Sequence, residues 1–260
     1  MRSILGVATL LAAGVAGAFE LDETRLVDLT HPFDATTIYW PTQAPFALER
    51  LARGRTPAGH WYAANRFCAA EHGGTHLDAP VHFAEGGAGA DAVPLARLVG
   101  PAVVVDVVAD AARDPDLEVA VAHLERHERA HGRIPSGAIV LVRTGWGARW
   151  PDRRRYLGDD TPGDAWDLHF PGVSRAAAAW LVAERRIDAV GIDTASIDHG
   201  PSRRFEAHQA LAAAGVPVFE NVAGLERLPA TGASLVALPM KIAGGSGGPL
   251  RVIAVLPPAR

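Results

Sequence analysis

Short apolar runs of β-forming residues recur along the chain, and segments with helical periodicity separate several of them. The runs are Leu26–Leu29, Ala102–Val108, Ala138–Arg143, Asp188–Ile192, Val216–Phe219, Ser234–Leu238 and Arg251–Leu256. Most are continuously apolar rather than alternating, which is typical of strands covered on both faces. The pattern therefore predicts a single mixed α/β domain.

Three segments between these runs have the spacing of helices: Pro115–His131, Ser174–Arg185 and Arg203–Ala214. Ser174 is a suitable N-cap because its hydroxyl can accept a hydrogen bond from a free backbone N–H. Gly215 favours the end of the third helix because glycine tolerates the left-handed conformation of a helix terminus.

The first 18 residues have the layout of a cleavable secretory signal. Arg2 precedes an apolar run, Ile4–Val15, and small residues lead to a predicted cut after Ala18. The alternative is a membrane anchor, but the run is shorter than the roughly 20 apolar residues that a span requires. We expect an exported protein, periplasmic or secreted, whose mature domain covers residues 19–260.

The composition indicates the general class of protein but not its activity. The 260 residues are 48% hydrophobic and 21% charged, which indicates an ordered globular chain. The net charge of -4 gives no reason to expect nucleic acid or a membrane surface as a partner of the mature protein. A single cysteine, Cys68, excludes an intrachain disulfide, and its apolar neighbours predict that it is buried.

The stretch EHGGTHLDAPVHF carries the densest group of chemically active side chains. Its spacing is His72-x3-His76-x-Asp78-x3-His82. Its proline and paired glycines disfavour a helix and favour a turn that leads into an extended segment. Alternate side chains of that segment would put His76 and Asp78 on one face, with His72 folded back beside them. Two imidazoles and a carboxylate suit zinc or manganese.

A second pair of potential ligands, His208 and Glu220, lies far along the chain. From His208 to Ala214 a helix would rise about 9 Å. A returning strand would cover about 13 Å before Glu220, which brings the two side chains to a similar level. On spacing alone, an exposed histidine and an unrelated glutamate are slightly favoured.

Three other patterns are better explained without chemistry. His123, His127 and His131 align along a helix, but their charged neighbours favour a solvated face.

The run GGSGG matches a G-x-S-x-G nucleophile elbow in form, but Pro249 and a β-type run follow it instead of a helix. Asp193, Ser196 and His199 are too close along one loop for a catalytic relay, so a substrate-binding or structural loop is favoured.

With these residues identified, HGGTHLDAPVH resembles the HxGTHxDxPxH signature of the cyclase family of metal-dependent hydrolases, which includes kynurenine formamidase and isatin hydrolase. The similarity continues in DLTHPF, YWP, GIDTASID, HQALAAAGVPVFENV and LPMKIAGGSGGPLR, and so covers nearly all of the mature chain. It implies an α/β domain of the cyclase type that assembles as a homodimer or larger homo-oligomer.

The resemblance also implies roles for individual residues. His72, His76 and Asp78 would bind a metal, and His82 would transfer a proton. His208 and Glu220 would hold a second metal bridged by Asp78, which reverses the preference from spacing. We therefore expect one or two Mn²⁺ or Zn²⁺ ions per chain, and Trp40 as a wall for a flat substrate.

These implied parts predict hydrolysis of a C–N amide bond in a small aromatic substrate. A divalent metal activates water at neutral pH, and a nearby histidine protonates the leaving amine. An export signal fits a cyclic, isatin-like amide better than cytoplasmic breakdown of N-formylkynurenine, so the arylformamidase is the alternative. The non-enzymatic alternative is an exported metal- or ligand-binding protein, which would not need His82.

Overall fold

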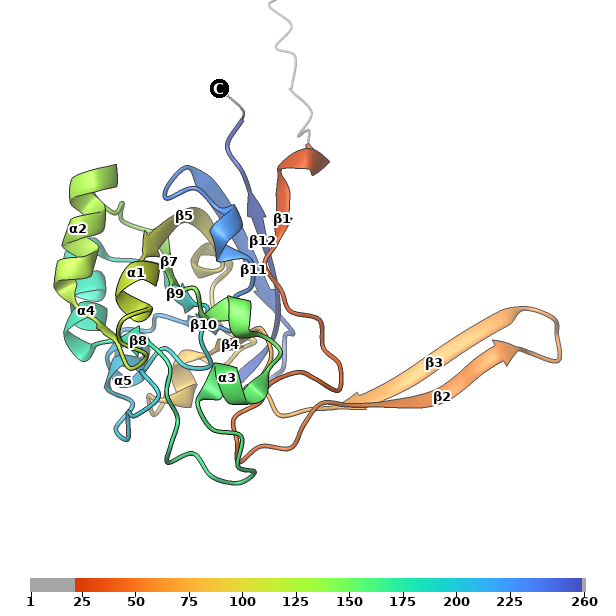
Figure 1. Ribbon diagram of the computed structural model, residues 1–260. Coiled ribbons are helices and arrows are strands. Elements are labelled where there is room, and N and C mark those ends of the chain that lie inside the picture. Colours follow the sequence, from red (N-terminus) through yellow and green to blue (C-terminus); the bar gives the residue numbers. More distant parts are fainter. Residues whose placement is uncertain (1–21, 259–260) are drawn as a thin grey trace, which may run out of the picture.

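The computed structural model describes residues 22–258, and a closed barrel of strands forms its centre (Figure 1). The seven strands follow the order β12-β11-β5-β7-β9-β10-β4, and β4 pairs back onto β12 to close the barrel. Their bounds are β4 His76–Asp78, β5 Val99–Asp106, β7 Ile139–Arg143, β9 Ala189–Ile192, β10 Val218–Glu220, β11 Ala233–Pro239 and β12 Gly247–Val255. A further strand, β1 Leu26–Asp28, pairs with β12.

All seven predicted apolar runs form strands of this sheet, which confirms the pattern from which they were predicted. The mixed α/β class fits only loosely, because the sheet closes on itself and helices cover only part of it. The predicted signal, residues 1–18, lies outside the described residues. Within residues 22–258, no helix is long and apolar enough to cross a bilayer.

The helices pack mainly against one side of the barrel (Figure 1). They are α1 Val108–Ala111, α2 Val121–His131, α3 Arg153–Leu157, α4 Arg175–Trp180 with its π-helical extension Leu181–Arg185, and α5 Glu206–Ala213. Ser174 caps α4 by accepting a bond from the backbone N–H of Ala177, and Gly215 takes a positive φ of 67° after α5, as predicted.

Two hydrophobic layers result from the alternation of side chains along the strands. One fills the barrel and includes Leu77, Leu141 and Phe219. The other lies between the strands and the helices, where Val140 and Leu211 are completely buried. Residues that alternate with the interior set on β4 and β10 therefore point out of the barrel, toward α5 and the loops around it.

The predicted helix Pro115–His131 is wrong at its start. Glu118–Val119 forms a short strand, β6, which pairs with β8 Gly172–Val173, so α2 begins only at Val121. The expectation of a solvated histidine row is also wrong at its centre, because His127 is buried.

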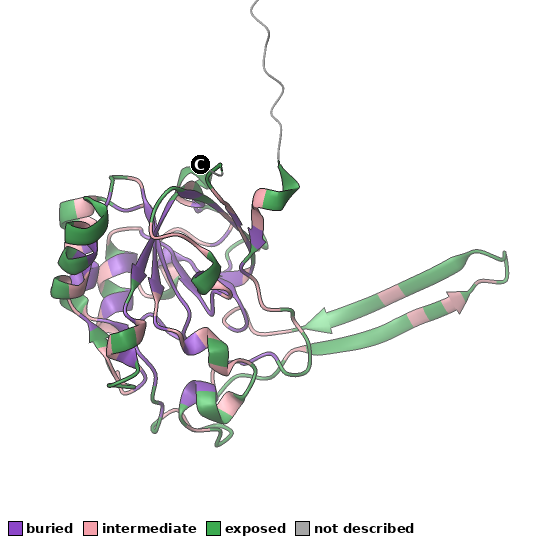
Figure 2. Cartoon of the chain, turned by 45° about the horizontal axis from the view of Figure 1, so that its top comes forward, coloured by how far each residue is buried: buried purple, intermediate pink, exposed green. Residues whose placement is uncertain are grey.

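A long hairpin that the apolar pattern did not predict projects from the body of the molecule. Strands β2 Ala47–Arg55 and β3 Trp61–Cys68 pair only with each other, and most of their residues are exposed (Figure 2). Cys68, at the end of β3, is exposed, so the prediction that it is buried is wrong.

Candidate metal centre

Strands β4 and β10 place the central side chains of the site. The two strands are antiparallel, with His76 opposite Glu220 and Asp78 opposite Val218. Leu77 and Phe219, which lie between these residues in sequence, point into the barrel core. His76, Asp78 and Glu220 are therefore directed to the same outer face, where each is at most 4% exposed.

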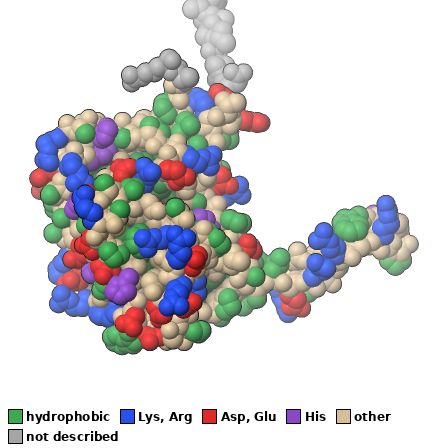
Figure 3. Space-filling model, viewed as in Figure 1, with side chains coloured by type: hydrophobic (Ala, Val, Ile, Leu, Met, Phe, Trp, Pro, Cys, Tyr) green, Lys and Arg blue, Asp and Glu red, His purple; other side chains and the backbone are tan. Residues whose placement is uncertain are grey.

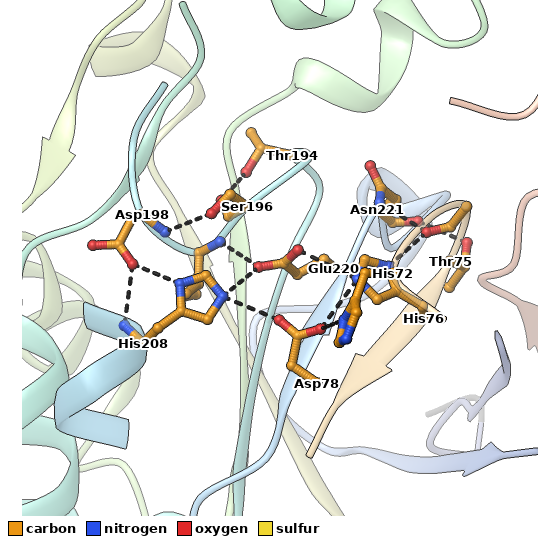
Figure 4. Close-up of polar contacts among 12 residues, drawn as sticks. His72, Thr75, His76, Asp78, Thr194, Ser196, Asp198, His208, Glu220 and Asn221 are labelled. Carbon is orange, nitrogen blue, oxygen red and sulfur yellow. Dashed lines mark hydrogen bonds and ion pairs between the residues drawn. The ribbon is translucent and has the colours of Figure 1, made fainter. Parts of the chain in front are cut away.

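The two oxygens of Asp78 face different imidazoles (Figure 4). Oδ1 lies 2.6 Å from Nδ1 of His72 and 3.2 Å from Nε2 of His76. Oδ2 lies 3.0 Å from Nε2 of His208. A single carboxylate thus stands between histidines from both ends of the site.

Glu220 completes the cluster from the neighbouring strand. Its Oε1 lies 3.1 Å from Nε2 of His208, and its Oε2 lies 3.5 Å from Nε2 of His76. The backbone N–H of Ile197 also donates to Oε1 at 2.7 Å, which fixes the carboxylate. The helix α5 and strand β10 bring His208 and Glu220 together as the doubling-back geometry requires.

Backbone and side-chain acceptors orient two of the histidines. Nδ1 of His76 donates to the carbonyl of Gly74 at 2.9 Å, so its Nε2 faces the carboxylates. Nδ1 of His208 lies 2.6 Å from Oδ2 of Asp198, and its Nε2 likewise faces the site. Such outer partners are typical of metal-ligating histidines because they fix the ring and the free nitrogen.

The electrostatics of the cluster reflect carboxylates held close together and out of water. Burial together with the negative charge of Asp78 raises the pKa of Glu220. Burial also disfavours charge on Asp78, but His76, His208 and His72 outweigh it and hold the pKa of Asp78 well below its usual range. Burial works against a charged His208 too, yet bonds to Asp198, Asp78 and Glu220 raise its pKa well above the ordinary value. The site is thus built to hold positive charge.

The donor set fits a divalent metal. Two groups of three side chains have ligand atoms within 4.8 Å of one another: His72, Asp78 and His82, and His76, Asp78 and Glu220. Nε2 of His76 is buried without a hydrogen-bond partner, although it points at two carboxylates. Imidazole nitrogens and carboxylate oxygens that converge in this way suit zinc and manganese.

A cavity of about 310 Å³ opens directly over this cluster. Trp40, Phe83 and Phe205 supply aromatic parts of its wall, and Ser196 and Asn221 supply polar ones. The ring of Trp40 packs edge-on against Phe170 at 6.4 Å between centroids. Trp40 thus lines the cavity, and its role as a wall for a flat substrate stays a prediction.

His82 lies at the rim of the same cavity. It ends a short 3₁₀ helix, Pro80–His82, and its ring stacks on His72 with centroids 3.8 Å apart. Desolvation by its surroundings lowers the pKa of His82 to about 4, although Asp78 acts in the opposite direction. Its imidazole is therefore neutral at neutral pH.

Asp198, Glu71 and Ser246 belong to the site although no role was predicted for them. Asp198 lies in the loop GIDTASID and receives N–H bonds from Ala207 and His208 besides its contact to the imidazole. Ser246 lies in GGSGG and contacts His72. The only sequence signal for Asp198 and Ser246 is that their two loops lie within segments shared with the family.

The two rejected serine motifs do not form nucleophilic sites. Ser246 is followed by strand β12, not by a helix. Asp193 accepts bonds from Thr144 and Gly145, and His199 lies 3.5 Å from Glu118, so neither meets Ser196 as a relay.

Comparison with known proteins shows the family to which the chain is related. The model of the Cyclase family matches residues 27–199. Isatin hydrolase of Roseibium aggregatum is 32% identical over 77% of this chain and 78% of its own length, and kynurenine formamidase of Sphingopyxis alaskensis is 29% identical over 88% and 97%.

Solved structures are similar over the whole fold. Isatin hydrolase A from Labrenzia aggregata, bound to benzyl benzoate, has a TM-score of 0.81 at 35% identity and covers 90% of this chain and 94% of its own. An isatin hydrolase bound to the product analogue thioisatinate has a TM-score of 0.80 at 28% identity, with 90% and 92% covered. The chain belongs to the Cyclase family, as its histidine signature predicted.

Proposed function

We propose that this protein is a metal-dependent hydrolase that cleaves the C–N amide bond of a small aromatic cyclic amide of the isatin type. The observation that carries the proposal is the aromatic cavity that opens over the His/Asp/Glu cluster. The similarity to isatin hydrolases in sequence and fold supports the substrate class.

In this proposal His72, His76 and Asp78 would hold one divalent ion, and His208 and Glu220 would hold a second together with Asp78. The ion, Mn²⁺ or Zn²⁺, supplies Lewis-acid activation of water and of the amide carbonyl. The donors present on the two oxygens of Asp78 support either one or two ions per chain.

The protein's own residues then bind the ring and move a proton. Trp40 and Phe205 hold the flat substrate while the oxygen of water bonds to the carbonyl carbon and the C–N bond breaks. His82, neutral at neutral pH, takes a proton from the water and delivers it to the departing nitrogen. Ring opening leaves a carboxylate and an amine on the same product, and the second proton of the water is released to solvent.

An aryl formamide such as N-formylkynurenine is the second candidate substrate. The match to kynurenine formamidase, which extends over 97% of that protein, favours it. The same residues would act on it, but the products would be formate and a free aromatic amine.

Metal-depleted protein, resupplied with Mn²⁺ or Zn²⁺, tests both candidates in parallel against isatin and N-formylkynurenine. We expect metal-dependent opening of the isatin ring, visible as a change in its absorption spectrum, at a higher kcat/KM than formate release. Asp78→Asn is the matched control and should abolish both reactions. A metal-loaded protein that cleaves neither compound would support a binding protein instead.

We further propose that the chain forms a homodimer through the β2–β3 hairpin. A two-stranded hairpin is marginally stable alone, yet this one exposes five large apolar side chains: Leu48, Leu51, Trp61, Tyr62 and Phe67. The pairing of Leu48 with Phe67, and the alternation along β3, place Leu48, Trp61 and Phe67 on one face.

Charge complementarity favours a second copy as the occupant of this face. The hairpin, Ala47–Cys68, carries four arginines and one glutamate, a net charge of +3, and these charges accompany its apolar side chains (Figure 3). The rest of the chain carries 21 basic and 28 acidic residues, so the hairpin is attracted to the body of another copy.

Export to the periplasm or beyond is likewise a proposal, and it is supported by the layout of residues 1–18. N-terminal sequencing of protein recovered from the periplasm should give Phe19 as the first residue. A start at Met1 in the cytoplasm would contradict export.

A further inference from the structure

The glycine-rich loop that precedes β12 brings a serine against the first histidine of the site. Nε2 of His72 lies 2.8 Å from Oγ of Ser246. Ser246 in turn donates twice to one oxygen of Glu71, from its hydroxyl at 2.5 Å and from its backbone N–H at 2.9 Å. The three residues form a chain of hydrogen bonds that ends on the imidazole.

The direction of these bonds determines which ring nitrogen carries a hydrogen. A serine hydroxyl has one hydrogen to donate, and Ser246 gives it to the carboxylate of Glu71, which can only accept. Oγ is then an acceptor toward His72, so Nε2 of that ring must be the donor. Nδ1 is then the ring nitrogen left to face the site, where it lies 2.6 Å from Oδ1 of Asp78 and can exchange a proton for a metal ion.

His72 thus turns the other ring nitrogen toward the site than His76 and His208 do. His76 and His208 are each held through Nδ1, by Gly74 and Asp198, and present Nε2 to the carboxylates. His72 is held through Nε2 and presents Nδ1. Among the described residues, Ser246 is the hydrogen-bond partner of Nε2 of His72, and Glu71 fixes the direction of that bond.

The glycines around Ser246 leave space for this arrangement. A Cβ on Gly245 would lie 2.7 Å from Oε1 of Glu71, and a Cβ on Gly247 would lie 2.6 Å from Cε1 of His72. The pairing of Gly247 with Asp78 fixes the loop relative to the site. The GGSGG run, which does not form a nucleophile elbow, is shaped to fit against Glu71 and His72.

We propose that Glu71 and Ser246 are positioning residues that fix the Nε2-protonated form of His72 and so present its Nδ1 to the metal. This inference rests on the proposed metal centre, but it concerns hydrogen bonds that exist without the ion. Residues that orient metal-ligating histidines typically change metal affinity 10- to 100-fold when they are replaced.

The experiment measures the proton position and the metal affinity separately. Long-range ¹H–¹⁵N spectra of Zn²⁺-loaded protein with ¹⁵N-labelled histidine report which nitrogen of His72 keeps its proton and which faces the ion. Competition with a chromogenic chelator gives the affinity for Zn²⁺. The variants are Ser246→Ala and Glu71→Ala, with Glu71→Gln as the conservative variant and the exposed Glu226→Ala as the control.

We expect the wild type to show Nε2-protonated His72 and both alanine variants to lose at least tenfold in Zn²⁺ affinity. Glu71→Gln should stay within about threefold of the wild type, because its amide oxygen can still accept from Ser246. A wild-type His72 protonated on Nδ1, or alanine variants with unchanged Zn²⁺ affinity, would overturn the proposal. Failure of the hydrolase proposal would appear differently, as tight Zn²⁺ binding and the expected His72 spectrum without turnover.

Discussion

Among the histidines of the centre, His82 is the one that faces solvent at the cavity rim, whereas His76 and His208 are buried. The stack on His72 holds its ring within reach of the cavity, and its lowered pKa keeps it neutral. The position at the cavity rim suits a residue that exchanges protons with substrate and water. The same ring belongs to one of the two possible ligand groups, so its role needs a test that separates chemistry from metal binding.

Replacement of His82 by alanine is expected to lower kcat by at least 100-fold while metal content stays unchanged. Positioned acid–base catalysis contributes about 10²- to 10⁴-fold, and the other ligands remain in place. The measurements are steady-state turnover and metal analysis of the same sample, with the exposed His131→Ala as the control. Unchanged turnover would reject the proton-transfer role, and loss of metal would make His82 a ligand.

At this scale the sequence predicted the side chains that converge at the site better than it predicted the residues that hold them in place. The motif His72-x3-His76-x-Asp78 was informative because its turn residues and its alternation are local. Asp198 and Ser246 gave no such signal. Each acts through a bond to a residue distant in sequence, and only the closed sheet brings these partners together.

At the scale of elements, apolar continuity predicted every barrel strand except the short β4, because these strands are buried on at least one face. It did not predict the β2–β3 hairpin, since an exposed ribbon has no core-facing side to leave a hydrophobic pattern. The prediction that α2 begins at Pro115 was wrong for another reason. Two residues, Glu118–Val119, pair with β8 in preference to extending the helix.

The end of α2 is joined to the helix that follows α4 by a pair of largely buried charges. Glu128 accepts from Nε of Arg185 at 2.6 Å and from Nη2 at 2.8 Å, and it also accepts from the backbone N–H of Ile134. The bond from Arg185 is the main reason that the pKa of Glu128 is lowered. The charged carboxylate therefore stabilises the folded state.

Glu128→Gln should reduce the free energy of unfolding by about 2 kcal/mol at pH 7, the usual contribution of hydrogen bonds to charged groups. Because the folded-state pKa is lowered, this contribution is complete above the unfolded-state pKa and disappears as pH falls through the folded-state value. Urea unfolding of both proteins across the acid range measures the difference. Replacement of the exposed Glu125 on the same helix by glutamine should have little effect. A difference in unfolding free energy between wild type and Glu128→Gln that stays constant down to low pH would contradict the role given to the Glu128 carboxylate.

At the scale of the whole molecule, the hairpin extends well beyond the body and offers an apolar, basic surface (Figures 2 and 3). Leu48→Glu is expected to convert the proposed dimer to monomer, because it puts a charge on the face that the second copy would cover. Light scattering coupled to size-exclusion chromatography measures the mass.

Leu95, on the body, provides a matched control because it is 69% exposed, compared with 62% for Leu48. The Leu95→Glu variant should keep the molecular mass of a dimer. A wild-type protein that is monomeric at every concentration, or a Leu48→Glu variant that remains dimeric, would contradict the assembly.

The closing strand of the barrel, β4, also carries two of the proposed metal ligands, His76 and Asp78. With only three residues, β4 covers one side of β10 and one side of β12. If it came loose, both neighbours would expose free N–H and C=O groups, which are templates for aggregation. Because Asp78 on β4 and Glu220 on β10 both belong to the proposed metal centre, bound metal would hold these two strands together and keep their edges paired.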